Sequence, residues 1–313
     1  MKVGLVLGAG GTAGLAYHAG VLHALSEVTG LDSTAVDLIV GTSAGSVAGA
    51  YLRSGWTAND LWDETVGQAG ALQPDMEILA PAFKSGLDLV RRTLGSAYVV
   101  GVSLAHMPSV PMPGLLRRAF PGGLFLMADG ETHIAAQLHR GWPDRALWLC
   151  AADLVSGHRV VLGQDPDDPL SLRRAVMASC AIPAVYSPVR SRGRVLVDGG
   201  LVSTTNLDLA ADAGCDLIIG VAPMAYDPSD PPNALHRALR RIPSRSLSFE
   251  AARARRQGSR VVLIRPTSSE IDLHGLNLMR RDGLDAIAQA AYDATARTLG
   301  SGALRSVVNE VAA

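Results

Sequence analysis

Short apolar runs that end at glycines alternate with helical periodicity along the first part of the chain. The first run covers residues 3–7, a glycine-rich segment follows it, and a helical pattern extends from about residue 15 to residue 27. The second run covers residues 36–40 and leads through another glycine-containing turn into a helix that reaches about Leu52. Each of these two segments predicts a buried strand, a tight turn and a helix.

Later apolar runs predict four more buried strands, at residues 147–151, 194–197, 216–221 and 260–265. Strands that are apolar throughout and alternate with helices are typical of a mainly parallel sheet covered on both faces. The predicted fold class is therefore α/β, a three-layer α/β/α sandwich with a mainly parallel central sheet.

We expect a single domain over residues 1–313. Its motif-bearing core covers about residues 3–223, and a C-terminal strand and helices follow over about residues 224–313. Repeated prolines interrupt the alternation of strands and helices between about residues 55 and 130. This stretch predicts an inserted helical cap.

The charge and the cysteine content limit the kinds of partner and the cellular setting that we expect for this chain. The formal net charge is −1, so the chain has no long-range field to attract nucleic acid, and no nucleic-acid partner is expected. The three cysteines, Cys150, Cys180 and Cys215, lie far apart without CxxC pairs. This spacing argues against a disulfide framework and a zinc site, and it favours a reducing, cytoplasmic setting.

No uninterrupted apolar run reaches the roughly 18 residues that a membrane-spanning helix needs, so we expect any membrane contact to be peripheral. Residues 236–260 contain eight arginines with little acidic compensation. This segment is either a solvated helical surface or a contact site for anionic lipid head groups.

Ser43 is the candidate nucleophile. It lies in a GxSxG pattern between a predicted strand and a predicted helix, which is the arrangement of a nucleophile elbow. A serine at such a tight turn projects its hydroxyl outward, and side chains two residues away on either side would collide, so Gly41 and Gly45 have a steric role. The alternative is a glycine-rich turn in which Ser43 is an ordinary helix N-cap.

The first glycine loop, Gly8 to Gly14, places unpaired backbone N–H groups at the start of a helix, where the helix dipole favours negative charge. It suits the oxyanion of a tetrahedral intermediate or the pyrophosphate of a dinucleotide. The spacing GxGxxG of dinucleotide-binding proteins has Ala13 at its third glycine. Asp32 lies near the expected distance of a ribose-binding carboxylate, but it precedes the second strand instead of ending it.

Asp198 ends an apolar strand and is followed by Gly199 and Gly200. A carboxylate in a water-poor cleft can act as the base for a serine hydroxyl when desolvation raises its pKa. The competing mechanism is a triad of Ser43, Asp198 and either His236 or His274. The position of Ser43 after only one strand-loop-helix unit argues against that triad, because several strands precede the nucleophile in α/β-hydrolases.

Three segments in the order Gly8 to Gly14, Gly41 to Ser46 and Asp198 to Gly200 resemble the motifs of the patatin-like phospholipase family. The resemblance extends from Val3 to about Pro223. Secondary similarities are Gly20-Val21-Leu22, the segment from Ala178 to Pro183, and Asn206.

The resemblance implies a three-layer α/β/α fold and a Ser-Asp dyad that hydrolyses acyl esters of lipids without a metal or an organic cofactor. It assigns Ser43 as the nucleophile and Asp198 as the base, and it assigns the oxyanion hole to backbone N–H groups of Gly10, Gly11 and Thr12. The motif glycines are Gly8, Gly14, Gly41, Gly45, Gly199 and Gly200.

This chain departs from the family pattern at three positions. Ala9 replaces the first glycine of the loop, and Ala13 stands where the family has a basic residue. Leu207 follows Asn206 where the family often has proline. These departures bear on the substrate and on the local turn, but they leave the dyad in place.

The predicted function is a serine lipid acyl hydrolase of the phospholipase A, lysophospholipase or esterase type, with a lipid or another acyl ester as its substrate. Three alternatives remain at this point: an acyltransferase that uses the same dyad, a nucleotide-binding protein that uses the first glycine loop, and a catalytically silent lipid-binding protein.

Overall fold

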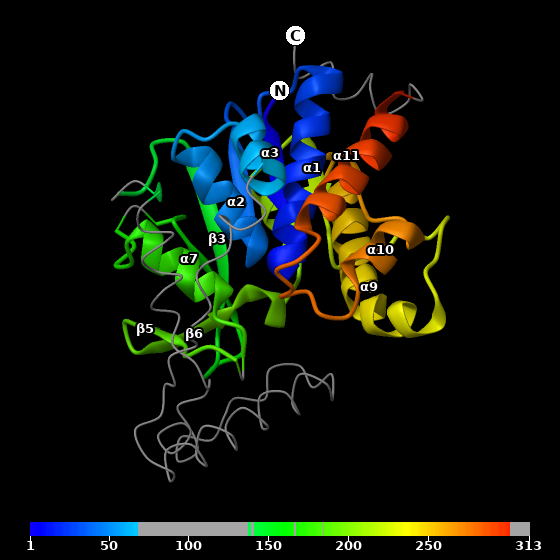
Figure 1. Cartoon of the computed structure of the whole chain (residues 1–313). Coiled ribbons are helices and arrows are strands. Elements are labelled where there is room, and N and C mark those ends of the chain that lie inside the picture. Colours follow the sequence, from blue (N-terminus) through cyan, green and yellow to red (C-terminus); the bar gives the residue numbers. More distant parts are fainter. Residues whose placement is uncertain (68–136, 139–140, 166, 184, 301–313) are drawn as a thin grey trace. The chain divides into compact units, whose positions relative to one another are not determined.

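The computed structural model describes residues 1–67, 137–138, 141–165, 167–183 and 185–300 (Figure 1). The chain divides into two compact units. Unit 1 comprises Met1–Gln73, Pro143–Trp148 and Ser203–Ala313, and unit 2 comprises Pro74–Trp142 and Leu149–Val202. Most of the predicted cap at residues 55–130 lies outside the described residues, and that cap and the single domain over residues 1–313 stay predictions.

Unit 1 contains four parallel strands in the spatial order β2, β1, β7 and β8. In the register, Leu7 at the end of β1 lies opposite Gly41 of β2 and Val221 of β7. Because the carboxyl ends of parallel strands meet at one edge, the turns that follow β1 and β2 leave the sheet side by side. The four strands are β1 (Val3–Leu7), β2 (Leu38–Thr42), β7 (Leu217–Val221) and β8 (Arg260–Ile264).

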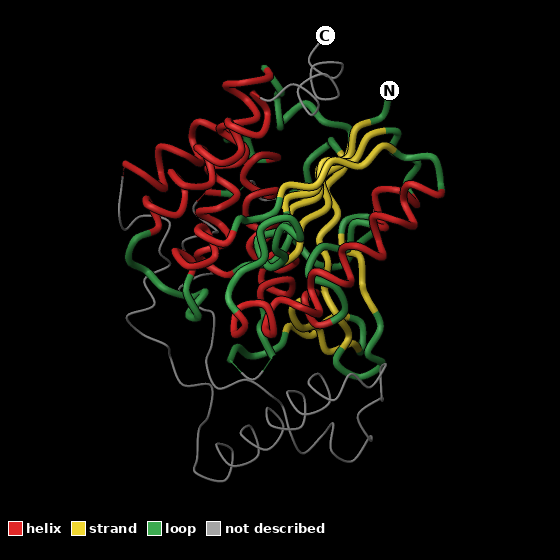
Figure 2. Tube along the Cα trace, turned by 90° about the vertical axis from the view of Figure 1, so that its right-hand side faces the viewer, coloured by secondary structure: helices red, strands yellow, loops and turns green. Residues whose placement is uncertain are grey.

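Helices cover both sides of these strands (Figure 2). Helix α1 packs against α2, α3 and α11, whereas α8 packs against β1, β2 and α9. A Cβ atom at Gly20 of α1 would overlap the carbonyl group of Ala288 in α11, so the two backbones approach each other closely there. The helices of unit 1 are α1 (Gly11–Thr29), α2 (Ala44–Arg53), α3 (Ala58–Gly67), α8 (Asp208–Asp212), α9 (Ala234–Arg256), α10 (Ser268–His274) and α11 (Leu284–Gly300).

Unit 2 is built on antiparallel pairing. Strand β3 begins in unit 1 and continues in unit 2, where it pairs with β4 and β6, and β5 pairs with β6. Helix α7 packs against β6. The elements are β3 (Ala146–Asp153), β4 (Arg159–Leu162), α7 (Leu172–Cys180), β5 (Val189–Ser191), β6 (Arg194–Asp198) and the short 3-10 helix η2 (Gly199–Leu201).

The predicted α/β class is confirmed, and each of the six predicted strands is present. The sequence analysis missed β4 and β5, because they have only four and three residues and their apolar runs are too short to predict a strand. The basic segment at residues 236–260 forms most of helix α9. Within the described ranges, no helix combines the length and the apolar character needed to cross a membrane.

Candidate active site

Ser43 is the residue that joins β2 to α2 in unit 1. Its backbone has φ of 52° and ψ of −119°, a conformation that is strained for a residue with a side chain. The turn is closed by Ser46, whose backbone N–H and Oγ both donate to the Ser43 carbonyl oxygen, at 2.8 and 2.6 Å. Ser43 is only 5% exposed. The side chain is thus held in a strained, fixed position at the carboxyl edge of the parallel strands.

The two glycines around Ser43 are required by close backbone contacts. A Cβ atom at Gly41 would lie 2.7 Å from the Gly45 carbonyl oxygen and from Ser46 Cα. A Cβ atom at Gly45 would overlap the carbonyl group of Leu7, the last residue of β1. Any larger residue at either position would therefore displace the strand or the helix that positions Ser43.

Asn206 fixes the residue that precedes Ser43. Its Nδ2 group donates to Thr42 Oγ1 at 3.0 Å and to the Ser203 carbonyl oxygen at 2.7 Å. Asn206 is fully buried and has a positive φ of 54°, which asparagine tolerates better than most residues. The resemblance drew attention to Asn206, and the structure gives its side chain a defined contact beside the Ser43 turn.

Glu250 of α9 holds the segment that contains Asn206. Its carboxylate is buried and accepts hydrogen bonds from Ser203 Oγ, Ser246 Oγ, Thr205 Oγ1 and the Leu207 backbone N–H. The Leu207 bond, at 2.8 Å, needs an N–H group that proline lacks. The sequence analysis missed Glu250, although it is the single acidic residue among the seven arginines of α9.

The glycine loop leaves three backbone donors unused within the described part of the chain. Its other N–H groups have backbone acceptors: Gly8 donates to Val221, Ala9 to Thr204, Ala13 to Leu278, and Gly14 to Gly10. The N–H groups of Gly10, Gly11 and Thr12 donate to no described residue, and they belong to the start of α1, where the helix dipole favours an anion. This loop and the Ser43 turn follow neighbouring strands at the same edge.

The glycines of this loop differ in what they require. Gly11 has a positive φ of 62°, and a Cβ atom there would lie 2.5 Å from the Leu278 carbonyl oxygen. A Cβ atom at Gly10 would lie 2.6 Å from Gly14 Cα. A Cβ atom at Gly14 would make only ordinary contacts, 3.5 Å from Pro223 Cβ and 3.6 Å from Ala44 Cβ. The loop therefore depends on Gly10 and Gly11 more than on Gly14.

His18 supports the loop from within α1. Its Nε2 atom lies 2.7 Å from the Gly8 carbonyl oxygen and donates to it. Burial lowers the pKa of His18 to about 4, although the hydrogen bond to Gly8 opposes this shift. His18 is therefore neutral near pH 7 and carries its proton on Nε2. Its contact with Gly8 is structural, because it holds the start of the loop against α1.

Asp198 is the last residue of β6 in unit 2. Its backbone N–H donates to the Ala181 carbonyl oxygen at 2.9 Å, and its Oδ1 accepts from the Gly200 N–H at 2.7 Å. Asp198 is only 6% exposed. A Cβ atom at Gly199 would overlap the Cys150 carbonyl group of the neighbouring strand β3, so a glycine is needed directly after Asp198.

The two histidines of the rival triad have other contacts. His274 is buried, its Nδ1 lies 3.2 Å from Arg240 Nη2, and its ring packs edge-on against Tyr17. Burial and the nearby Arg240 charge lower the pKa of His274 to about 3. Its Nε2 has no partner among the described residues. His236 lies 3.4 Å from Asp272. In unit 1, neither ring is hydrogen-bonded to the Ser43 turn.

The position of Asp32 argues against a dinucleotide at the glycine loop, because Asp32 was the candidate to bind the ribose. Asp32 accepts hydrogen bonds from the backbone N–H and the hydroxyl of Thr34, in the turn before β2. This turn precedes the amino end of β2, whereas the glycine loop follows the carboxyl end of β1, so Asp32 and the loop belong to opposite edges of the parallel strands. Among the described residues, no three His, Cys, Asp or Glu side chains are grouped to hold a metal ion.

A serine on a strand-turn-helix elbow, next to a helix start whose backbone donors have no described acceptor, is the arrangement expected in α/β acyl hydrolases with a serine nucleophile. Residues 5–211 match the family model described as patatin-like phospholipase, and the chain belongs to this family. The resemblance noted from the three motifs is thus confirmed, and the predicted enzyme class, a lipid ester hydrolase, agrees with it.

Curated relatives carry related names. The chain is 28% identical over 231 residues to "Lysophospholipase nte1" of Aspergillus fumigatus, which covers 73% of this chain and 12% of the fungal protein. It is 29% identical over 202 residues to an uncharacterized NTE family protein of Mycobacterium bovis, which covers 64% of this chain and 27% of that protein. The chain thus spans only a small part of these relatives.

A solved structure, VipD from Legionella pneumophila, aligns with a TM-score of 0.48 and 16% identity, over 96% of this chain and 67% of that one.

Proposed function

We propose that the protein is a serine lipid acyl hydrolase of the phospholipase A, lysophospholipase or esterase type, in which Ser43 is the nucleophile and Asp198 the base. One observation carries the proposal: unit 1 pairs a strained, buried serine with three backbone donors that have no acceptor among the described residues. The serine and the donors lie on neighbouring turns at one edge of the parallel strands. Family membership and the lysophospholipase name of a relative support a lipid ester as the substrate.

In the proposed acylation step, Asp198 takes the proton of Ser43 as Oγ attacks the acyl carbonyl carbon. The carbonyl oxygen becomes an oxyanion that accepts hydrogen bonds from the N–H groups of Gly10, Gly11 and Thr12. The C–O bond to the leaving alcohol then breaks, Asp198 returns the proton to that alcohol, and Ser43 carries the acyl group as an ester.

In the proposed deacylation step, Asp198 accepts a proton from water as the water oxygen attacks the acyl carbonyl carbon. Collapse of the second tetrahedral intermediate releases the fatty acid and returns the proton to Ser43. The nucleophile is already held by its turn, so little reorganisation is needed before attack.

Ala13 limits what the first loop does with the substrate. Its side chain is fully buried, and its backbone N–H donates to the Leu278 carbonyl oxygen. Where other family members have a cation, this chain has none, so recognition of a charged head group falls to other residues. The loop supplies oxyanion donors alone.

The first experiment is covalent labelling with a fluorophosphonate probe, which reacts with an activated serine. We expect wild type to be labelled and Ser43→Ala to be unlabelled, while Ser54→Ala, a serine at the end of α2, keeps full labelling. Equal labelling of Ser43→Ala would remove Ser43 from the mechanism and leave a lipid-binding role.

The second experiment separates the dyad from a triad on a short-chain nitrophenyl ester. We expect Asp198→Asn to lower kcat by at least about a thousandfold, since the base acts in both steps. His236→Ala and His274→Ala should stay within about threefold, provided that thermal melts show them to be folded. A histidine substitution that abolishes turnover while Asp198→Asn does not would overturn the assignment.

A further inference from the structure

The outward face of helix α9 carries four large apolar side chains, Leu235, Leu239, Ile242 and Phe249. Their spacing of four, three and seven residues puts them in one stripe along the helix. Each is exposed, from 49% for Ile242 to 68% for Phe249. Four large exposed apolar side chains on one side of a helix mark an interaction surface.

The solvent-exposed side of α9 also carries three arginines, of which Arg245 lies next to this stripe. Arg237, Arg241 and Arg245 follow each other at intervals of four residues, and all three are exposed. Arg245 is three residues after Ile242 and four before Phe249, so it neighbours both on the helix surface. Within the described chain, these three arginines have no hydrogen-bond or ion-pair partner. The helix's single acid, Glu250, faces inward.

A pocket of about 290 Å³ opens beside the same part of α9. Two guanidinium groups, of Arg245 and Arg265, and three hydroxyl-bearing side chains line it. Arg265 Nε is buried and has no partner among the described residues, and its Nη2 lies 3.7 Å from Asp227, a loose ion pair. Two guanidinium groups with hydroxyl donors match the oxygens of a phosphate. The lining residues are Tyr226, Pro228, Ser244, Arg245, Ser248 and Arg265.

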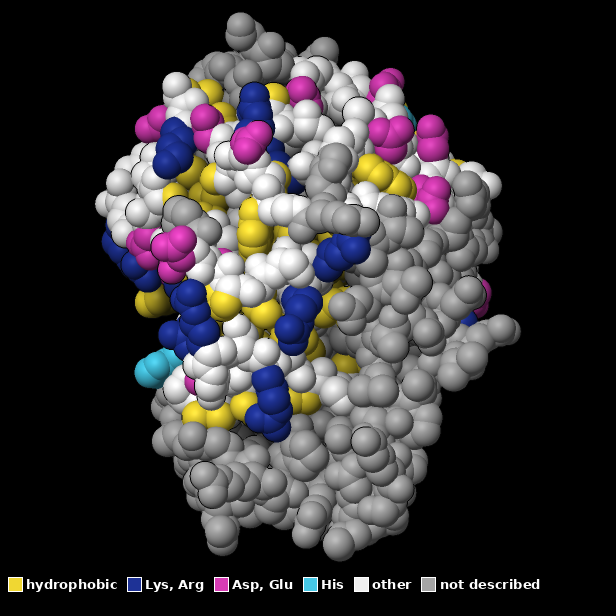
Figure 3. All heavy atoms as spheres, turned by 90° about the vertical axis from the view of Figure 1, so that its left-hand side faces the viewer, with side chains coloured by type: hydrophobic (Ala, Val, Ile, Leu, Met, Phe, Trp, Pro, Cys, Tyr) yellow, Lys and Arg dark blue, Asp and Glu magenta, His cyan; other side chains and the backbone are white. Residues whose placement is uncertain are grey.

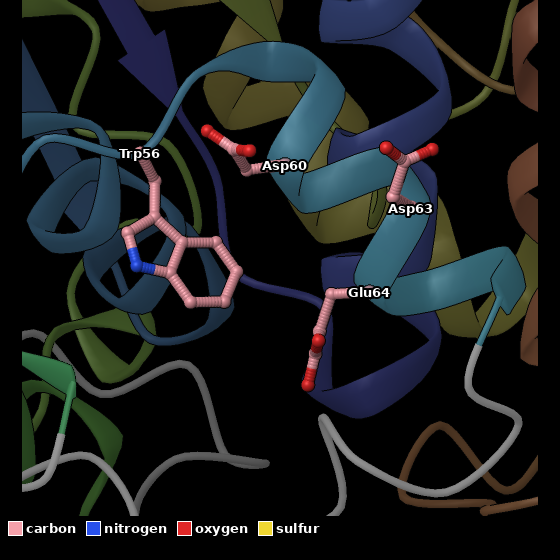
Figure 4. A pocket seen from close by; sticks show the side chains of 4 residues that line it. All are labelled: Trp56, Asp60, Asp63 and Glu64. Atoms are coloured by element: carbon pink, nitrogen blue, oxygen red, sulfur yellow. The ribbon is translucent and has the colours of Figure 1, made fainter.

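A second pocket, of about 470 Å³ in unit 1, has the opposite character. Figure 4 shows the side chains that line this pocket, which are Trp56 and three carboxylates of α3: Asp60, Asp63 and Glu64. Those carboxylates would repel a phosphate, so the charge pattern distinguishes α9 from this part of the unit. Of these two pockets, the α9 pocket combines cations with an adjoining apolar stripe.

We propose that this face of α9 docks the protein on a membrane that contains anionic phospholipid. The apolar stripe enters the head-group region, Arg241 and Arg245 lie against lipid phosphates, and the pocket of Arg245 and Arg265 holds one phosphate head group. The docking surface rests on the proposed function only in that a lipid hydrolase finds its substrate there. Binding itself needs neither Ser43 nor Asp198.

The test is co-sedimentation of the full chain with phosphatidylcholine vesicles that contain about 30% phosphatidylglycerol, against phosphatidylcholine alone. We expect binding to the anionic vesicles that weakens with added salt, because the arginine contribution is screened. Removing two charges with Arg241→Gln and Arg245→Gln should weaken binding about 25-fold, about fivefold for each arginine. Phe249→Ser should also weaken vesicle binding. The binding that remains should depend more strongly on salt, because the arginines then supply a larger share of it.

A matched control removes two arginines elsewhere. Lys and Arg side chains also gather on the face seen in Figure 3, on the side where Figure 1 shows β5 and β6. Arg190 and Arg192 are exposed at the β5–β6 hairpin, and Arg190→Gln with Arg192→Gln lowers the net charge equally. If this pair weakens binding as much as the α9 pair, binding follows net charge and the proposal is wrong.

Two further measurements keep the docking proposal apart from the proposed hydrolase. Ser43→Ala should bind anionic vesicles like wild type, and the α9 variants should cleave a soluble nitrophenyl ester like wild type. Binding of inorganic phosphate without any binding to vesicles would overturn membrane docking, as would equal affinity for neutral and anionic vesicles.

Discussion

The turn after β1 and the turn after β2 leave the same edge of the parallel strands, and each begins a helix, yet they present different groups. The turn after β2 presents one side chain, Ser43, in a strained conformation enforced by backbone contacts on both sides. The turn after β1 presents no side chain but three backbone N–H groups at the start of α1. One turn positions the proposed nucleophile, and the other offers the proposed site for the oxyanion.

Glycine serves these two turns for different reasons. Gly41 and Gly45 keep space free around Ser43, so they are needed for their missing side chains. Gly11 is needed for its backbone, because its φ is positive and the Leu278 carbonyl lies against it. A motif glycine is thus essential only where the structure leaves no room or requires a left-handed backbone.

The largest effect within this comparison is expected for Gly11→Ala against Gly14→Ala. A methyl group at Gly11 would overlap the Leu278 carbonyl group, and alanine is strained at the left-handed backbone conformation of this residue. The loop must therefore shift, and its N–H groups would no longer point at the oxyanion. We expect kcat to fall by about 100- to 1000-fold, as for the loss of an oxyanion donor. Gly14→Ala should stay within about threefold. Steady-state kinetics on a nitrophenyl ester measure both.

Labelling with a fluorophosphonate separates the two turns in these variants. Ser43 should keep its position in Gly11→Ala, since the turn after β2 is unchanged, so the probe should still label Ser43 in this variant although ester turnover is slow. Equal losses in Gly11→Ala and Gly14→Ala would mean that the loop requires small residues generally and that the N–H groups are not its functional part.

A smaller effect is expected from Glu250, because it supports both turns at once. The segment that it holds supplies the Thr204 carbonyl to Ala9 and the Asn206 side chain to Thr42. Glu250→Ala leaves buried donors unpaired, above all the Leu207 N–H, which costs about 2 kcal/mol of unfolding free energy. We expect kcat to fall about tenfold with little change in KM. Denaturant unfolding and steady-state kinetics report the two quantities.

Glu250→Gln is the conservative variant for this prediction. Its amide oxygen can still accept from Leu207 and Thr205, and the Ser246 hydroxyl can rotate to accept from its NH₂ group. Ser203 Oγ cannot do so, because it already accepts from two backbone N–H groups. It should therefore restore most of the activity that Glu250→Ala loses. Ser246→Ala removes only the outer bond, at 3.2 Å, and should have the smallest effect. If the Gln and Ala variants are equally impaired, the carboxylate charge matters more than the hydrogen bonds.

The sequence predicted the elements that carry strong local signals. Continuous apolar runs located β1, β2, β3, β6, β7 and β8, and glycines located both turns. Glu250 could not be found in this way, because its value depends on donors more than forty residues away, brought to it by the fold. The difference between Gly11 and Gly14 was hidden for the same reason, since it depends on Leu278 and Pro223.

Ser43 and Asp198 were chosen from motifs, and the structure gives each a defined local geometry, one in unit 1 and one in unit 2. Their partnership stays a prediction for the kinetic test of Asp198→Asn. The stripe on α9 shows the opposite case: the arginines were evident in the sequence, but which apolar residues faced water depended on the packing of α9 against α8 and β8.

The smallest expected effect is on the pH dependence of the unfolding free energy, and it also differs between the two turns. The turn from Gly41 to Gly45 has no titratable side chain, whereas the loop after β1 is supported by His18 through the Gly8 carbonyl. Since burial lowers the pKa of His18 to about 4 from 6.5, the folded protein keeps this ring neutral while the unfolded chain protonates it. The resulting stability is fully present above pH 6.5 and is lost as the pH falls towards 4.

Replacing His18 with glutamine, which can still donate to Gly8, removes this proton uptake. From pH 8 to pH 5.5, the unfolding free energy of wild type should fall by about 1.4 kcal/mol more than that of His18→Gln. Urea unfolding at the two pH values measures this difference, whatever the substitution costs at pH 8. Parallel pH dependence in the two proteins would show that His18 is protonated equally when folded and unfolded, and that the loop has no pH-sensitive support.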